Sequence, residues 1–139
     1  MNAALTGDSN GGIMLGSADL IAFVPTRNPA KAQQFYESTL GLEFISADSF
    51  ALVFNAHGTT MRIANVSQVK DFRPAPFTIV GWRVTSVSDT VGDLEKKGVR
   101  FERFPGMDQD PQGIWQSPSG AKVAWFKDPD GNILSITQP

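Results

Sequence analysis

Two segments of the chain repeat one pattern of apolar and polar positions. In residues 28–44, apolar and aromatic side chains recur at helical spacing, the pattern stops at Gly41, and an apolar strand pattern follows at once. Residues 86–101 repeat this order and stop at Gly98. A glycine just after the last periodic residue is typical of a helix end. The repeat indicates one supersecondary unit that is used twice.

Apolar runs between turn-forming residues predict the remaining elements. Asn28 is a suitable N-cap and Pro29 suits the first helical position, so the first helix begins here. His57 and Gly58 predict a hairpin turn. The second helix is predicted at 89–97, and the predicted strands are 20–24, 42–45, 49–55, 59–65, 77–85, 99–104, 113–116, 121–126 and 133–137.

These elements divide the chain into two modules, each with the order strand, helix and three strands. Gly, Ser and Asn residues near the start predict a flexible tail. We expect a tail at 1–17 and a single domain at 18–139, with module one at 18–65, a linker at 66–76 and module two at 77–138. This order predicts an α+β fold with mostly antiparallel sheet. Residues 105–120 depart most from the repeat and predict a loop that covers a site.

Composition narrows the classes of function. The 139 residues carry a net charge of −2, and the basic residues are scattered, so we expect no nucleic-acid partner. No apolar run is long enough to span a membrane, and residues 1–17 lack the features of a signal peptide. The absence of cysteine excludes disulfides and thiolate ligands and suits a reducing compartment. We therefore expect a cytoplasmic protein.

Three motifs in this order resemble the glyoxalase / bleomycin-resistance / extradiol-dioxygenase superfamily, also called vicinal oxygen chelate proteins. They are Phe35-Tyr36 with Leu40-Gly41, Leu94 with Gly98-Val99, and DPDGN at 128–132. The resemblance covers residues 18–138 and is specific for the fold, not for one function. It implies two βαβββ modules that form an open, mostly antiparallel, barrel-like sheet around a small-molecule cavity.

In many members of this superfamily a divalent metal lies in the cavity. Its ligands come from the first and last strands of each module, and the resemblance places these positions at Ile21, Arg62, Ile79 and Ser135. Divalent metals need imidazole, carboxylate or thiolate donors, which these residues do not supply. Residues one position away do not supply them either. We therefore expect no metal and no other cofactor.

Strand alternation predicts which side chains share the cavity face. Phe23 follows Ile21, and Arg83 follows Ile79, while Trp115 is carried by the 105–120 loop. The predicted ligand-binding residues are Ile21, Phe23, Arg62, Ile79, Arg83, Trp115 and Ser135. Two alternatives stay open at this point. The arginines can instead pair with Glu43, Asp48 or Glu102 at the rim, and Trp115 and Trp125 can instead fill the core.

Two further motifs have simpler interpretations than a functional one. His57 is the only histidine, so a turn residue is favoured over a catalytic base. Residues 128–132 alternate oxygen donors, but the glycine is misplaced for an EF-hand, so a tight turn is favoured over a calcium loop.

Four hypotheses about function follow. The first is a metal-free binding protein for a small aromatic or apolar anion. The alternative is a metal-dependent lyase, isomerase or dioxygenase of the same superfamily. A metal-free enzyme would use Arg62 or Arg83 as an electrophilic clamp, and an interaction module would have no ligand. Whether the chain is an enzyme is open. Open sheet edges also predict a homodimer.

Overall fold

A computed structural model describes residues 14–139 of the chain. Residues 1–13 of the predicted tail lie outside the described residues, and η1, a short 3₁₀ turn, follows at Leu15–Ser17. The strands are β1 (Ile21–Thr26), β2 (Glu43–Ala47), β3 (Ala51–Ala56), β4 (Thr59–Asn65), β5 (Thr78–Arg83), β6 (Trp115–Gln116), β7 (Lys122–Lys127) and β8 (Ile133–Gln138).

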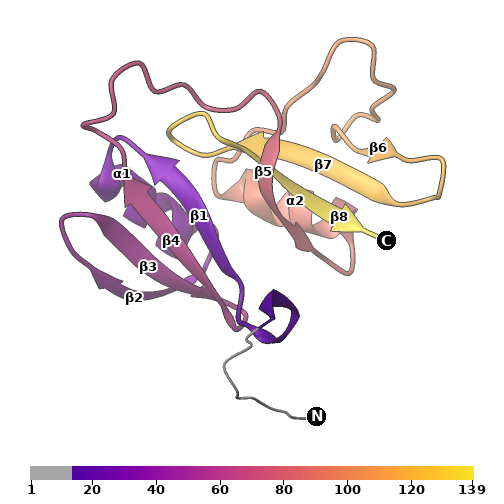
Figure 1. Ribbon diagram of the computed structural model, residues 1–139. Helices are drawn as coiled ribbons and strands as arrows, with labels where there is room; N and C mark the ends of the chain where they lie inside the picture. Colours follow the sequence, from indigo (N-terminus) through magenta and orange to yellow (C-terminus); the bar gives the residue numbers. More distant parts are fainter. Residues whose placement is uncertain (1–13) are drawn as a thin grey trace.

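Each module forms its own four-stranded sheet, with the order β1-β4-β3-β2 in module one and β5-β8-β7-β6 in module two. The first and last strands of a module pair in parallel, and the other pairs are antiparallel. In Figure 1, β1 and β5 lie side by side, and the helices lie behind the sheets. The predicted α+β fold with two βαβββ modules is confirmed, as two open sheets and not a closed barrel.

The first predicted helix forms in two parts. The Asn28 side chain accepts the Lys31 N–H at 3.2 Å and caps α1 (Pro29–Gln33), as the sequence predicts. The chain then continues as a wider π-helix, η2 (Gln34–Thr39), and Gly41 follows with a φ of 76°. In module two, Ser86 caps α2 (Val87–Lys96). No helix within residues 14–139 is long and apolar enough to cross a membrane.

The core lies between the sheets and the helices and is continuous across both modules. In module one the buried side chains of Leu52, Ile63 and Val24 face one another across three neighbouring strands. In module two Leu134 and Ile136 of β8 are buried in the same way. The period-two pattern therefore predicted correctly which side of these strands packs against the helices.

Residues 99–104 do not form the predicted strand. Only Phe101 makes an isolated bridge, to Phe126 of β7. The physical reason is Gln109, whose amide takes over the local backbone groups. It donates to the Glu102 carbonyl at 3.0 Å and accepts the Phe104 N–H at 2.8 Å. These backbone groups are thereby satisfied by the following loop and not by a sheet.

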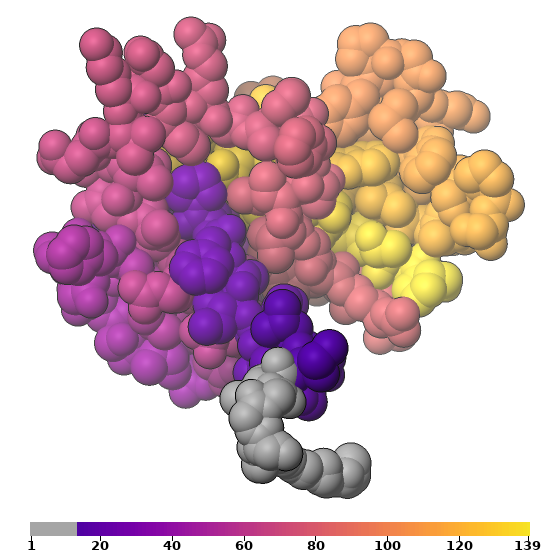
Figure 2. Space-filling model, viewed as in Figure 1, coloured from indigo at the N-terminus to yellow at the C-terminus, as the bar shows by residue number. Residues whose placement is uncertain are grey.

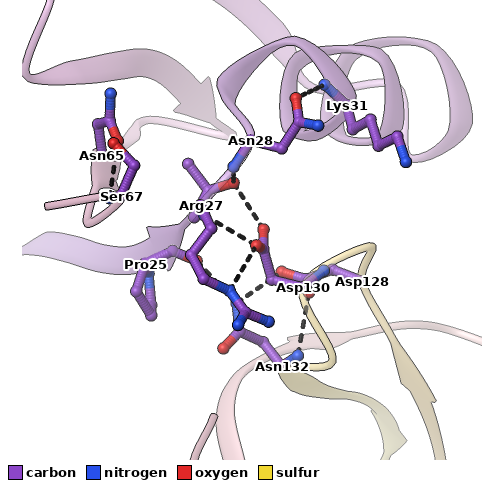
Figure 3. Close-up of polar contacts among 10 residues, drawn as sticks. Pro25, Arg27, Asn28, Lys31, Asn65, Ser67, Asp128, Asp130 and Asn132 are labelled. Atoms are coloured by element: carbon purple, nitrogen blue, oxygen red, sulfur yellow. Dashed lines mark hydrogen bonds and ion pairs between the residues drawn. The ribbon is translucent and has the colours of Figure 1, made fainter. Parts of the chain in front are cut away.

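The DPDGN turn joins the two modules through buried polar contacts, which we call the module clasp (Figure 3). Asp128 accepts the Tyr36 hydroxyl at 2.6 Å and the Asn132 side-chain amide at 2.8 Å, and it also accepts the backbone N–H groups of Asp130 and Asn132. Asn132 also donates to the Pro25 carbonyl of β1 at 2.9 Å. Because the Asp128 oxygens accept these protein donors, the turn interpretation of the motif holds and the calcium interpretation does not.

A second set of contacts holds the end of β1 to the same turn. Asp130 accepts the Thr26 hydroxyl at 2.6 Å and the Arg27 N–H at 2.8 Å. The Arg27 guanidinium in turn lies 5.4 Å from the centre of the Phe72 ring, a cation–π contact with the segment between the modules. The connecting segment is therefore attached to the clasp.

Burial and the neighbouring charge of Asp128 raise the pKa of Tyr36 far above its ordinary value of about 10. Below that ordinary value the folded and unfolded states both hold the proton, and at higher pH only the unfolded state loses it. The contribution of Tyr36 to the free energy of unfolding is therefore fully present below a pH of about 10 and is lost as the pH rises further. Tyr36 is the only tyrosine, so its phenolate has a clean ultraviolet signal. We predict that this signal appears only together with unfolding, monitored by circular dichroism.

The control is the same alkaline titration in denaturant, where Tyr36 ionises with its ordinary pKa. A phenolate signal that rises at ordinary pKa while the circular dichroism stays native would contradict the buried hydrogen bond to Asp128.

Candidate functional site

The surface of each sheet that turns away from the helices, here called the open face, carries the predicted site residues except Ile79. In module one Val53, Arg62 and Phe23 lie opposite one another on three neighbouring strands. Phe23 is 63% exposed, and Ile21 on the same strand is 47% exposed. Figure 2 shows the surface of β1 on this side of the molecule. Arg62 thus lies between two apolar side chains on a central strand, which is an uncommon position for an arginine.

The carboxylates predicted to neutralise the arginines have other partners. Within residues 14–139 the ion pairs closer than 4 Å are Arg27–Asp130 and Lys127–Glu102. Glu43 accepts from the Asn55 amide, and Asp48 accepts the N–H groups of Phe50 and Ala51. Those N–H groups are the main cause of a lowered pKa at Asp48, to which the charge of Arg62 adds a smaller part. Among residues 14–139, neither Arg62 nor Arg83 is therefore held in an ion pair.

An irregularity in β5 changes the predicted face of module two. The register advances two residues, from Thr78 to Val80, while β8 advances one, so Ile79 is an extra residue. Ile79 packs against the core, and Gly81 lies opposite Ser135. Strict alternation had put Ile79 on the face of Arg83, and the irregularity separates the two.

Arg83 and Trp115 lie in one row across the open face of module two. The register joins Trp115, Val123, Thr137 and Arg83 on four neighbouring strands. Arg83 is at the β5 end of this row, where it borders a small hollow with Gln138. The structure therefore groups the predicted residues in two sets, one on each sheet: Ile21, Phe23 and Arg62 on module one, and Arg83, Trp115 and Ser135 on module two.

Trp125 covers the middle of the open face of module two. Its indole N–H donates to the Thr78 hydroxyl at 3.1 Å. Trp125 belongs to β7 and Thr78 to β5, with β8 between them, so the indole crosses over β8. Ser135, which lies opposite Trp125 in the register, is only 8% exposed. The Phe104 and Trp115 rings pack beside this indole, with centroids 5.5 and 6.2 Å away.

Sequence reasoning left Trp125 open between the pocket and the core, and it missed Thr78 and Gly81 as parts of the face. The lone glycine in the apolar strand was a usable signal, because such a glycine marks a bulge or a close approach. A Cβ at Gly81 would lie 2.5 Å from the Ser135 hydroxyl oxygen. No local pattern pairs Trp125 with Thr78, because that contact depends on the order of strands in the sheet.

The residues at the expected metal positions do not fit a divalent ion. Ile21 and Ile79 offer no side-chain lone pair, and Arg62 brings a positive charge. Ser135 alone carries an oxygen, and the Trp125 indole lies across it. In the part of the chain from 14 to 139, no three His, Cys, Asp or Glu residues cluster in a way that could hold a metal.

A family model described as the Glyoxalase/Bleomycin resistance protein/Dioxygenase superfamily matches residues 18–136. The chain belongs to this superfamily. No curated protein matches the chain. The superfamily assignment agrees with the two βαβββ modules and with the position of the DPDGN turn before the last strand.

Several solved structures share the fold at low sequence identity. A superfamily member from Sphaerobacter thermophilus matches with a TM-score of 0.68 and 21% identity, over 88% of this chain and 98% of that one. A lactoylglutathione lyase from Agrobacterium tumefaciens matches with 0.68 and 14%, over 88% and 93%. An antibiotic binding protein from Streptomyces sp. CB03234 matches with 0.65 and 22%, over 91% and 99%. One fold thus serves both an enzyme and a binding protein.

We predict that Gly81→Ala destabilises the protein by about 1–3 kcal/mol, the usual cost of overpacking. The added methyl group would meet the Ser135 hydroxyl oxygen at 2.5 Å and the Ser135 carbonyl oxygen at 3.0 Å. Urea unfolding measures the change. Adding Ser135→Ala removes the closer contact, so the double variant should recover part of the loss.

The matched control is Gly92→Ala in α2, where an added Cβ has no neighbour within 4 Å. It should leave stability unchanged or raise it by up to about 1 kcal/mol. Equal effects of the two substitutions would show that the contact between β5 and β8 is looser than described.

Proposed function

We propose that the chain is a metal-free small-molecule binding protein whose ligand is a small aromatic or apolar anion. The observation that supports this most is Arg62, which lies between Phe23 and Val53 and has no ion-pair partner among residues 14–139. The resemblance assigns this position to a metal ligand in metal-dependent members. A cation in that place repels a metal ion and attracts an anion.

The surroundings of Arg62 strengthen such an attraction. The apolar side chains of Phe23 and Ile21 lower the local dielectric once a ligand covers them, so opposite charges interact more strongly than in water. A guanidinium holds a carboxylate by two parallel hydrogen bonds. The aromatic side chains Trp115 and Trp125 on the second sheet add surface for a ring, and Arg83 ends the row that Trp115 begins.

We predict that Arg62→Ala weakens binding of such an acid about tenfold or more, because a hydrogen bond to a charged group is worth roughly 1.5–3 kcal/mol. Tryptophan fluorescence during titration with aromatic and aliphatic carboxylates measures this, and Arg83→Ala is tested in the same way. Arg100→Ala is the control, since Arg100 is exposed beyond the end of α2. Binding of neutral or cationic compounds only, or affinities untouched by both substitutions, would refute the proposal.

The alternative is a metal-dependent lyase, isomerase or dioxygenase, and one observation favours it: a lactoylglutathione lyase is among the proteins that share the fold. Elemental analysis of the purified protein separates the two functions. One tightly bound divalent ion per chain, lost on Ser135→Ala, would favour the enzyme over the binding protein.

We also propose that two copies associate through the strip formed by β1 and the start of β5. Leu20, Ile21, Phe23 and Phe77 are large exposed apolar side chains on or directly before these strands, and exposed apolar surface of this kind is typical of an interaction surface. A second copy that covers β1 would also enclose a ligand at Arg62. We predict a homodimer at micromolar concentration by light scattering and a shift toward monomer in Leu20→Glu. A purely monomeric wild-type protein would refute this part of the proposal.

A further inference from the structure

We infer that the ligand surface of module two is the indole of Trp125, positioned by Thr78, and that it selects a flat aromatic ring. This inference rests on the proposed function and concerns the ring of the ligand, whereas Arg62 concerns its charge. The indole also lies across position 135, where a residue that binds a metal would have to be accessible. The indole therefore occupies the place of the metal site on this sheet.

The contact between Trp125 and Thr78 fixes the orientation of the ring. A tryptophan on a strand normally stands away from the sheet. Here the indole N–H reaches a hydroxyl two strands away, at 3.1 Å, so the ring extends over β8. Ser135 beneath it is nearly buried, as is Ile133, which lies opposite Thr78 in the register.

The neighbouring residues suit this arrangement. Gly81 lies beside Ser135 on β5 and has no side chain that would compete for the place where the indole crosses. The Phe104 ring meets the indole edge to face, at an interplanar angle of 86°, and Trp115 is tilted by 40° against it. These ring contacts hold the indole in its orientation, and Trp125 itself remains partly exposed.

A braced, partly exposed indole recognises shape more than charge. Aromatic rings gain additional energy from offset stacking on an indole, and a puckered aliphatic ring of the same charge does not. Thr78 contributes without touching the ligand, because it holds the indole across the sheet. Thr78 is therefore a positioning residue, and Trp125 is the contact.

The experiment compares the affinities for naphthoate and cyclohexanecarboxylate. Calorimetry measures them, because variants that lack a tryptophan change the tryptophan fluorescence itself. The wild-type protein should prefer naphthoate, and Trp125→Leu should reduce this preference roughly threefold to tenfold. Thr78→Val, which removes the hydroxyl at nearly constant volume, should reduce it similarly, and Thr78→Ser should restore it. Trp82→Phe, on the core side of β5, is the control for general effects of tryptophan loss.

A nuclear magnetic resonance spectrum supplies a readout that needs no ligand. The indole N–H signal that disappears in Trp125→Leu should shift in Thr78→Val and keep its place in Thr78→Ser. An unshifted signal, or a naphthoate preference that survives Trp125→Leu, would overturn the inference while leaving the role of Arg62 intact. If neither acid binds the wild-type protein, the proposed function fails and the inference fails with it.

Discussion

The carboxylate of Asp128 holds the two modules in their relative positions. It accepts four hydrogen bonds, two from its own turn, one from the Asn132 amide and one from Tyr36 in the other module. Burial raises the pKa of Asp128, and the donors around it oppose that rise. A buried charge is costly unless its lone pairs are satisfied, so the turn, the π-helix and β1 must all be in place together. The hydrogen bond from Tyr36 to Asp128 thereby links the helical segment of module one to the last turn of module two.

Much of the fold could be predicted because its signals are local. The Asn28 cap, the glycines that end the helices and the His57-Gly58 turn each depend on a few neighbouring residues, and all three form as expected. Residues 99–104 failed as a strand because a glutamine side chain later in the chain binds their backbone. That competition has no signature in the segment itself.

The candidate site was predictable for module one and less so for module two. Phe23 and Arg62 share a face because β1 and β4 are regular, and alternation then suffices. In β5 one extra residue, Ile79, shifts the alternation, and the hydrogen bond of Trp125 joins strands that are not neighbours. A pattern in the sequence gives the period of a strand, but a bulge and a contact across a third strand are decided by the assembled sheet.

The π-helix at Gln34–Thr39 has a consequence for how this chain can vary. In an α-helix each residue turns the following side chains by about 100°, so a change in length by one residue redirects everything beyond it. Tyr36 lies inside this wider turn and reaches Asp128 only in its present rotation. Substitutions on the exposed side of the segment leave that rotation alone, whereas a one-residue deletion or insertion before Tyr36 turns the phenol away from its acceptor. Related sequences that keep the two modules in this arrangement should therefore differ here in residue type and agree in number.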